Sequence, residues 1–229
     1  MITATGRSLL AIDGIDGSGK SVLAERLAIA TASAGLQTVT LAVDDFRRPV
    51  DWHAGGRLEA DIYYDDYYDL PLLDRCLAAF MAGSPSVEIP VFDPAAHRID
   101  GHRTITFAGA ELAIVEGVFA LRLTSVSTAA GLIYLRASFS AARERIVARD
   151  TARGRDPADV HHRITARYFP SQERYLGAFD PMGRADVLVD HEESGTLRVA
   201  RFRPDHLGPT IADAVSRALG HFAPSPMVG

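Results

Sequence analysis

The eight residues from Gly14 to Ser21 constrain the fold of this chain more than any other segment. They read Gly-Ile-Asp-Gly-Ser-Gly-Lys-Ser and match the pattern G-x-x-x-x-G-K-S/T directly after a short apolar run. Glycines at these positions let backbone N–H groups turn inward around phosphate oxygens, and the following helix directs its positive N-terminal end at the same point. The pattern predicts a nucleotide-phosphate loop whose binding residues are Gly14, Ile15, Asp16, Gly17, Ser18, Gly19, Lys20 and Ser21.

Lys20 is also the one lysine among the 24 lysine and arginine residues of the chain. A planar guanidinium is too wide to replace a compact ammonium in a tight loop beside two phosphates. We therefore expect Lys20 to be catalytic through contact with the β- and γ-phosphates of ATP, and the Ser21 hydroxyl to bind Mg²⁺. The same bias toward arginine makes arginine-rich segments elsewhere weak evidence for a function.

Short apolar runs alternate with helical stretches along most of the chain, which predicts a mostly parallel sheet covered on both faces. We expect an α/β fold of the P-loop NTPase type, with three α/β/α layers and a five-stranded sheet. The predicted strands cover residues 8–12, 38–43, 112–115, 132–135 and 187–189, and residues 197–202 could add an edge strand. The predicted helices cover residues 21–34, 70–81, 141–150, 161–176 and 209–219.

Two features interrupt this alternation. Residues 87–92 and 103–107 alternate in polarity like a β-hairpin, which we expect to form an insert at about 86–108 on the substrate side of the ligand crevice. A helical lid is expected at about 149–160. We therefore predict a single domain of this P-loop type over residues 1–222, followed by a loose tail at 223–229.

The composition fits one globular domain. The chain has 229 residues, of which 47% are hydrophobic and 23% are charged, and its net charge is −5. The negative charge disfavours a general nucleic-acid binder, and no apolar run approaches the roughly 18–20 residues of a membrane span. Cys76 is the single cysteine, which excludes an internal disulfide and fits a reducing compartment. We expect a cytoplasmic protein that binds neither nucleic acid nor membrane.

Carboxylates follow two of the predicted strands. Asp44 and Asp45 come after the second strand, where one of them could accept a proton from an attacking hydroxyl or simply cap a turn. Glu116 ends the apolar run Ala113–Val115, which suits a magnesium-binding role beside Ser21. The residues alone leave open whether Asp44 or Asp45 is the base.

Arginines are dense after residue 140. Arg149, Arg153 and Arg155 surround the predicted loop between two helices, where they could close over ATP and stabilise charge on the transferred phosphoryl group. For Arg143 and Arg145 we expect a solvated helix face instead.

The acidic and aromatic segment 59–69 has two interpretations. Tyr64 and Asp65 could line the acceptor pocket, or the segment could begin a helix whose acids favour the helix dipole and whose tyrosines pack on the core. The eight histidines show no convincing spacing for a metal site.

These segments together resemble the uridine kinase-like branch of P-loop kinases, which also includes phosphoribulokinase and pantothenate kinase relatives. VDDFRR resembles the family's Asp-x-Phe-Tyr element, PVFD with His97 its P-x-Y-D…H element, AIVEG its strand ending in Glu-Gly, and RDTARGRD its lid. The resemblance implies Asp44 as the general base, Glu116 near magnesium, and Arg149, Arg153 and Arg155 in the lid. It further implies an acceptor site that includes Asp44, Arg47, Tyr64, Asp65, Phe92 and His97.

The departures from the family pattern fall on the acceptor side, where Arg47 and Phe92 stand in place of tyrosines. Arg47 and Arg48 could meet an anionic acceptor such as a phosphorylated sugar. We expect an ATP- and Mg²⁺-dependent kinase that phosphorylates a hydroxyl of a nucleoside such as uridine or cytidine, a sugar or a pantothenate-like molecule. The alternatives are a nucleotide-binding regulatory ATPase and a nucleoside monophosphate kinase. The resemblance also suggests a homo-oligomer.

Overall fold

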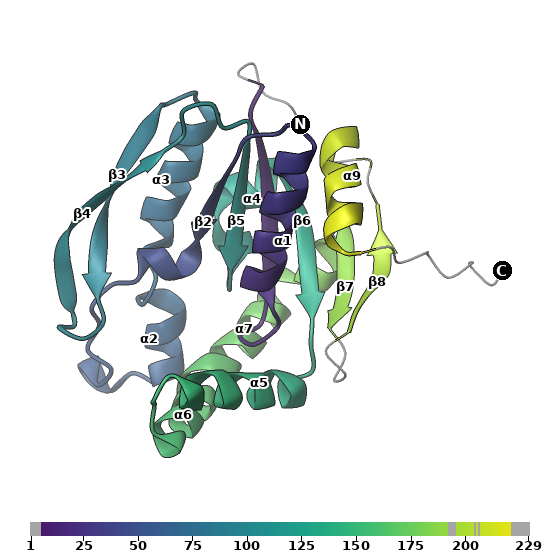
Figure 1. The fold of residues 1–229 in the computed structure, drawn as a ribbon. Coiled ribbons are helices and arrows are strands. Elements are labelled where there is room, and N and C mark those ends of the chain that lie inside the picture. Colours follow the sequence, from purple (N-terminus) through teal and green to yellow (C-terminus); the bar gives the residue numbers. More distant parts are fainter. Residues whose placement is uncertain (1–5, 192–195, 204, 206, 221–229) are drawn as a thin grey trace.

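The computed structural model describes residues 6–191, 196–203, 205 and 207–220. Its central sheet has six strands in the order β2-β5-β1-β6-β7-β8 (Figure 1). The first five are parallel, and β8 pairs antiparallel with β7. Their bounds are β1 Ser8–Gly14, β2 Thr38–Ala42, β5 Leu112–Gly117, β6 Ala130–Arg136, β7 Val187–His191 and β8 Leu197–Phe202. The predicted α/β class is confirmed, and the sixth strand is the edge strand that residues 197–202 could supply.

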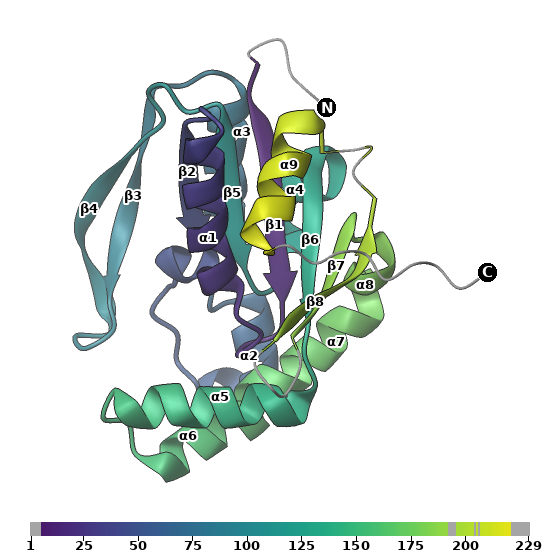
Figure 2. The same cartoon turned by 45° about the vertical axis from the view of Figure 1, so that its right-hand side comes forward.

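Successive side chains of the buried strands point into two different cores. Leu10 and Ile12 of β1 pack with α1 (Lys20–Ser33) and α9 (Pro209–Ala218). Leu9 and Ala11 pack in a larger core on the opposite face, which the helices α3 (Leu70–Met81), α4 (Thr124–Ala129) and α7 (Phe169–Phe179) cover (Figures 1 and 2). A strand that is buried on both faces has no polar side to show, so its sequence is a continuous apolar run.

The predicted hairpin is present as a separate two-stranded antiparallel sheet, formed by β3 (Ser86–Asp93) and β4 (Arg98–Thr106). Every described residue of β4 except Ile105 is exposed. The hairpin lies beside α3, away from α9 (Figure 2). The predicted tail at 223–229 lies outside the described residues.

The helices near the predicted lid differ in extent from the prediction. α5 covers Phe139–Ala152, and α6 begins at Pro157 and runs to Arg163, earlier than the predicted start at 161. The Asp156 side chain caps α6 by accepting hydrogen bonds from the backbone N–H groups of Ala158 and Asp159, at 2.8 and 3.2 Å. A π-helical turn over Ile164–Tyr168 then joins α6 to α7. The loop between α5 and α6 is therefore only four residues long.

The segment 59–69 contains a short helix, α2 (Glu59–Asp65), followed by a turn that leads into α3. α8 (Pro181–Arg184) is the remaining short helix before β7. Within the described ranges, no helix has the length and apolar character that crossing a membrane requires.

Candidate active site

The loop from Gly14 to Ser21 joins the end of β1 to the start of α1, as predicted. Gly17 and Gly19 have φ angles of +76° and +99°, a region that disfavours other residues. A Cβ at Gly17 would lie 2.6 Å from the carbonyl oxygen of Ala142, so the backbone of α5 approaches the loop too closely for a side chain. The Lys20 ammonium donates to the carbonyl oxygen of Ile15 at 2.9 Å and is nearly buried. The first-turn N–H groups of α1 have no intrahelical acceptor and are available for phosphate oxygens.

A cavity of about 520 Å³ opens over this loop. It brings together residues from the loop, from the ends of β2 and β5, and from α5. Its polar lining includes Asp16, Lys20, Ser21, Glu25, Asp44, Glu116, Arg145, Arg149, Arg153 and His191. The cavity lies at the carboxyl ends of the parallel strands, where open α/β sheets bind their ligands.

Ser21 and Glu116 are neighbours in this cavity. The Ser21 hydroxyl donates to Glu116 Oε1 at 3.1 Å. Burial raises the pKa of Glu116, Lys20 and the Ser21 hydroxyl lower it, and the charges of Asp44 and Asp45 raise it further. A hydroxyl and a carboxylate are ligands that Mg²⁺ prefers, and a bound cation would favour ionised Glu116. Ser21 and Glu116 therefore form a donor pair that fits Mg²⁺.

Asp44 and Asp45 point to different partners. Asp45 Oδ2 lies 2.7 Å from Arg103 Nη2 on β4, so this carboxylate is paired with the hairpin. Asp44 lines the cavity and accepts a hydrogen bond from the Tyr68 hydroxyl at 3.2 Å. This arrangement favours Asp44 over Asp45 as the group that meets an acceptor hydroxyl.

The arginines of α5 are arranged differently from the prediction. Arg145, predicted to be on a solvated face, lines the cavity, and its guanidinium lies 3.4 Å from the carbonyl oxygens of both Gly17 and His191. Arg145, Arg149 and Arg153 are four residues apart and so share one face of the helix, a signal present in the sequence. Arg155 lies outside the lining, because its Nη1 binds the carboxylate of Asp150 at 2.6 Å.

Asp150 joins the end of α5 to the loop between α5 and α6. Its side chain is 1% exposed and binds Arg149 Nε at 2.7 Å as well as Arg155. Burial opposes its ionisation, but the hydrogen bonds and charges of the two arginines outweigh burial and lower the pKa of Asp150.

The Asp150→Asn variant is expected to lose about 2 kcal/mol of unfolding free energy, measured by urea denaturation. The loss stays below that of a fully buried ion pair because the side chains of Arg149 and Arg155 are 43% and 39% exposed. Asp213→Asn on α9, which breaks an exposed pair with Arg217, is the matched control and should cost less than about 0.5 kcal/mol. Equal losses in the two variants would show that Asp150 does not organise the loop between α5 and α6.

Of the six predicted acceptor residues only Asp44 lines the cavity, and Tyr64 and Asp65 have partners elsewhere. Tyr64 is buried, and its ring packs against Phe119 with the guanidinium groups of Arg122 and Arg174 each 4.0 Å from its centre. Asp65 pairs with Arg57 at 3.2 Å and with Arg174 at 3.4 Å. Tyr64 therefore packs on the core, as the helix interpretation of segment 59–69 expects.

The other acceptor candidates gather between the hairpin and the residues after β2. Arg47 Nε donates to the carbonyl oxygen of Asp44 at 2.7 Å, and its guanidinium lies 5.9 Å from the ring centre of Phe92. The rings of Phe92 and His97 are 5.7 Å apart, and His97 Nε2 donates to the carbonyl oxygen of Val50 at 2.9 Å. These side chains lie next to Asp44 in the chain or on the hairpin, outside the lining of the cavity.

Asp13, directly before the loop, was not identified as important from the sequence. It is fully buried, its Oδ1 accepts from the Gly14 N–H at 2.7 Å, and its Oδ2 accepts from the Tyr175 hydroxyl. Burial raises the pKa of Asp13 to about 6, although these hydrogen bonds and Lys20 act in the opposite direction.

This raised pKa predicts a pH-dependent stability. Between about pH 4 and pH 6 the folded protein holds a proton on Asp13 that the unfolded chain releases, so the free energy of unfolding falls as the pH rises across this window. The fall attributable to Asp13 is about 3 kcal/mol. Urea denaturation at several pH values should show that Asp13→Asn removes it, and an unchanged slope in the variant would contradict the assignment.

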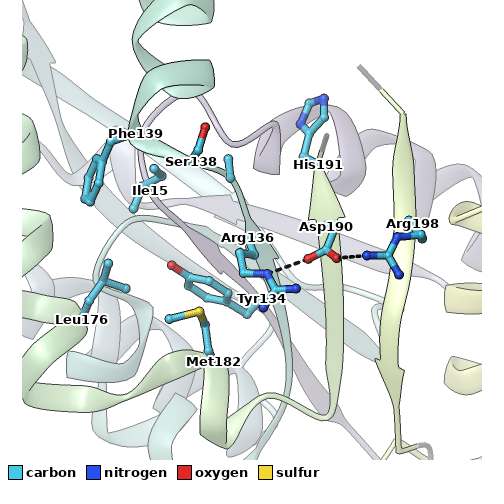
Figure 3. A pocket seen from close by; sticks show the side chains of 11 residues that line it. Ile15, Tyr134, Arg136, Ser138, Phe139, Leu176, Met182, Asp190, His191 and Arg198 are labelled. Atoms are coloured by element: carbon cyan, nitrogen blue, oxygen red, sulfur yellow. Dashed lines mark hydrogen bonds and ion pairs between the residues drawn. The ribbon is translucent and has the colours of Figure 1, made fainter. Parts of the chain in front are cut away.

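A second cavity, of about 530 Å³, adjoins the loop at the ends of β6 and β7. Figure 3 shows Asp190 between Arg136 and Arg198, with 2.6 Å to Arg136 Nε and 2.6 Å to Arg198 Nη2. His191, the next residue, donates from Nδ1 to the carbonyl oxygen of Ser18 at 2.6 Å. The two ion pairs of Asp190 thus hold the ends of β6, β7 and β8 together. His191, at the end of β7, contacts the phosphate loop.

Comparison with known proteins identifies the family. The model for the Phosphoribulokinase / Uridine kinase family matches residues 9–194. The chain belongs to this family. It is thus a P-loop kinase of the uridine kinase and phosphoribulokinase type, and the resemblance found in its motifs is confirmed.

Solved structures support the fold of this family member. A "possible uridine kinase" from Bacillus stearothermophilus superposes with a TM-score of 0.62 at 22% identity, over 80% of this chain and 88% of that one. Phosphoribulokinase from Rhodobacter spheroides superposes with a TM-score of 0.54 at 12% identity, over 82% of this chain and 71% of that one. None of the curated protein sequences compared with this chain matches it.

Proposed function

We propose that this family member transfers the γ-phosphoryl group of ATP to a hydroxyl of a small molecule, with Mg²⁺ as cofactor. The observation that carries the proposal is the meeting of Lys20, the Ser21–Glu116 pair and Asp44 in one cavity. Phosphoryl transfer needs little covalent chemistry from a protein, because positioning and charge stabilisation account for most of the catalysis. These residues supply both requirements.

Each side chain has a separate part in this proposal. Lys20 exchanges its contact with the Ile15 carbonyl for phosphate oxygens, and Arg149 and Arg153 compensate the charge of the transferred group. Ser21 and Glu116 would hold Mg²⁺, which when bound neutralises charge on the phosphates. Asp44 takes the proton of the acceptor hydroxyl.

The surroundings of Asp44 support a hydroxyl-rich acceptor such as a nucleoside or a sugar. Asp44 lines the cavity, and a carboxylate accepts hydrogen bonds from hydroxyls but repels a phosphate. Arg47 and Arg48, which could meet an anionic acceptor, each donate from Nε to a backbone carbonyl, that of Asp44 and of Asp66 respectively. A pantothenate-like or phosphorylated acceptor is the less favoured alternative on these contacts.

ADP release in the presence of candidate acceptors tests the proposal. The purified protein is incubated with ATP, Mg²⁺ and uridine, cytidine, fructose, pantothenate, ribose 5-phosphate, UMP or dTMP. At least one hydroxyl acceptor should raise ADP formation well above the rate without acceptor. The same slow rate with every acceptor would instead favour a regulatory ATPase, and stimulation by UMP or dTMP alone would favour a nucleoside monophosphate kinase.

The proposal also covers the cellular compartment and the oligomeric state of the enzyme. ATP is abundant in the cytosol, and the single buried cysteine is compatible with a reducing compartment. We therefore place the enzyme in the cytoplasm, acting on ATP and a small substrate. Size-exclusion chromatography with light scattering would test the homo-oligomer that the family resemblance suggests.

A further inference from the structure

Four acidic and phenolic side chains form a continuous row that joins the phosphate loop to Asp44. The Tyr63 hydroxyl lies 3.0 Å from Asp16 Oδ2 and 2.9 Å from the Tyr68 hydroxyl, and the Tyr68 hydroxyl lies 3.2 Å from Asp44 Oδ1. The order is therefore Asp16, Tyr63, Tyr68, Asp44. We call this set the proton row.

The middle of the proton row is buried and held in place. Tyr63 and Tyr68 are 2% and 5% exposed, and both rings pack edge-on against Phe119. At the far end, Gln172 fixes Asp16 twice, by donating from Nε2 to Asp16 Oδ2 at 2.6 Å and by accepting from the Asp16 N–H at 3.2 Å. The two end carboxylates line the cavity, whereas the phenols between them are shielded from it.

The number of protons in the row determines how many of its contacts can be hydrogen bonds. Three oxygen–oxygen contacts of hydrogen-bond length join the four groups, but with both acids ionised the two phenols supply only two protons. Each phenol then donates to its neighbouring carboxylate, and the 2.9 Å contact between the two hydroxyl oxygens has no proton. One additional proton makes all three contacts hydrogen bonds.

We propose that the proton row stores the proton that Asp44 removes from the acceptor hydroxyl. This inference rests on the proposed function. In the step, the acceptor O–H bond breaks, an O–H bond forms on Asp44, and the acceptor oxygen bonds to phosphorus as the bond to ADP breaks. After its carboxyl group turns, Asp44 donates to the Tyr68 oxygen, Tyr68 donates to Tyr63, and Tyr63 delivers its own proton to Asp16.

Tyr63, Tyr68 and Asp16 are therefore positioning residues, which act on the acceptor through Asp44. Burial, followed by the carboxylate charges, raises the pKa of Tyr63 and of Tyr68 well above the usual range, so both phenols stay protonated and can pass protons in sequence. Burial also raises the pKa of Asp16 and suits it to hold the stored proton. The charged and titratable groups that face the row from neighbouring elements are Lys20, Arg47, Tyr67, Glu116, Arg149 and Tyr168.

The test is a ¹³C NMR titration of the protein labelled at aspartate Cγ, without nucleotide or acceptor. Difference spectra from Asp16→Asn and Asp44→Asn assign the two signals. If Asp16 and Asp44 share a proton, the titration of each carboxylate should change when the tyrosine that it does not contact is replaced. Tyr68→Phe should move the titration midpoint of Asp16, and Tyr63→Phe that of Asp44, by about one pH unit or more.

The matched control is Tyr134→Phe, which removes another buried phenol oxygen, on β6, and should leave both midpoints unchanged. Should one tyrosine variant fail to fold, the other still tests the row, because each variant reports on the carboxylate that the altered tyrosine does not touch. Changes confined to the carboxylate that touches the altered tyrosine would overturn the proposal. Since the titration uses no substrate, it stands apart from the ADP-release assay, which alone decides whether the chain is a kinase.

Discussion

Lys20→Ala and Lys20→Arg are both expected to lower acceptor-dependent ADP formation by a factor of about 10³ or more. The alanine variant loses the charge that meets the β- and γ-phosphates. The arginine variant keeps the charge, but its wider planar guanidinium does not reproduce the compact ammonium that Lys20 holds beside the Ile15 carbonyl. Turnover is measured by ADP release with the best acceptor found.

Arg26→Lys, an exposed and charge-conserving change on the same helix, is the control for the Lys20 variants and should keep wild-type turnover. Thermal denaturation of all three variants should give midpoints close to that of the wild type, because the proposal places the Lys20 ammonium on the nucleotide and not in the apolar core. A Lys20→Arg variant with wild-type activity would contradict the role given to the ammonium.

Asp44→Asn is the second large effect. The amide keeps the shape of the side chain and can still accept from Tyr68, but it cannot take a proton, so we expect turnover to fall by about 10²–10⁴. ATP affinity, measured by isothermal titration calorimetry, should change by less than about tenfold, because Asp44 is placed on the acceptor and not on the phosphates.

Asp45→Asn distinguishes the two adjacent acids. It breaks the ion pair with Arg103. Because the side chains of Arg103 and Asp45 are 47% and 40% exposed, the loss of unfolding free energy should stay below about 1 kcal/mol. Turnover should fall less than about tenfold. A larger loss of activity in Asp45→Asn than in Asp44→Asn would reverse the assignment of the base.

The parts of the site that could be predicted from the sequence are those that the local chain builds. The phosphate loop, the apolar strand before it and the helix after it follow one another in the sequence. Lys20 and Ser21 could therefore be placed without tertiary information. Glu116 could also be predicted, because parallel strands bring their carboxyl ends to one edge of the sheet. The register between β1 and β5 indeed places Glu116 opposite Ile12.

Residues whose role depends on packing between distant segments were harder to predict. Arg145 was predicted to be on a solvated face. In the structure α5 lies across the phosphate loop, and the helix face that carries Arg145 lines the cavity. Tyr64 was predicted to be in the pocket, but α2 packs it against Phe119. Asp13 escaped notice because nothing local shows that Tyr175, 162 residues away, supplies its hydrogen bond.

The proton row shows the same limit. Tyr63 and Tyr68 belong to a segment that the sequence marked as unusual, yet the residues chosen there were Tyr64 and Asp65. The choice depends on which face of a short helix meets the loop, and α2 has only seven residues, too few to show a clear period. Its packing against α7 decides which tyrosine approaches Asp16, and Gln172 on α7 binds that same carboxylate.

Transfer of labelled phosphate from ATP to an acceptor hydroxyl tests the central claim most directly. The wild type and Asp44→Asn are incubated with ATP labelled at the γ-phosphate, Mg²⁺ and the best acceptor from the ADP-release assay. The label should appear as a phosphate ester on the acceptor with the wild type, and at least about a hundredfold more slowly with the variant. Label found only in inorganic phosphate, or equal transfer by the two proteins, would contradict the assignment of this cavity as a kinase active site with Asp44 as its base.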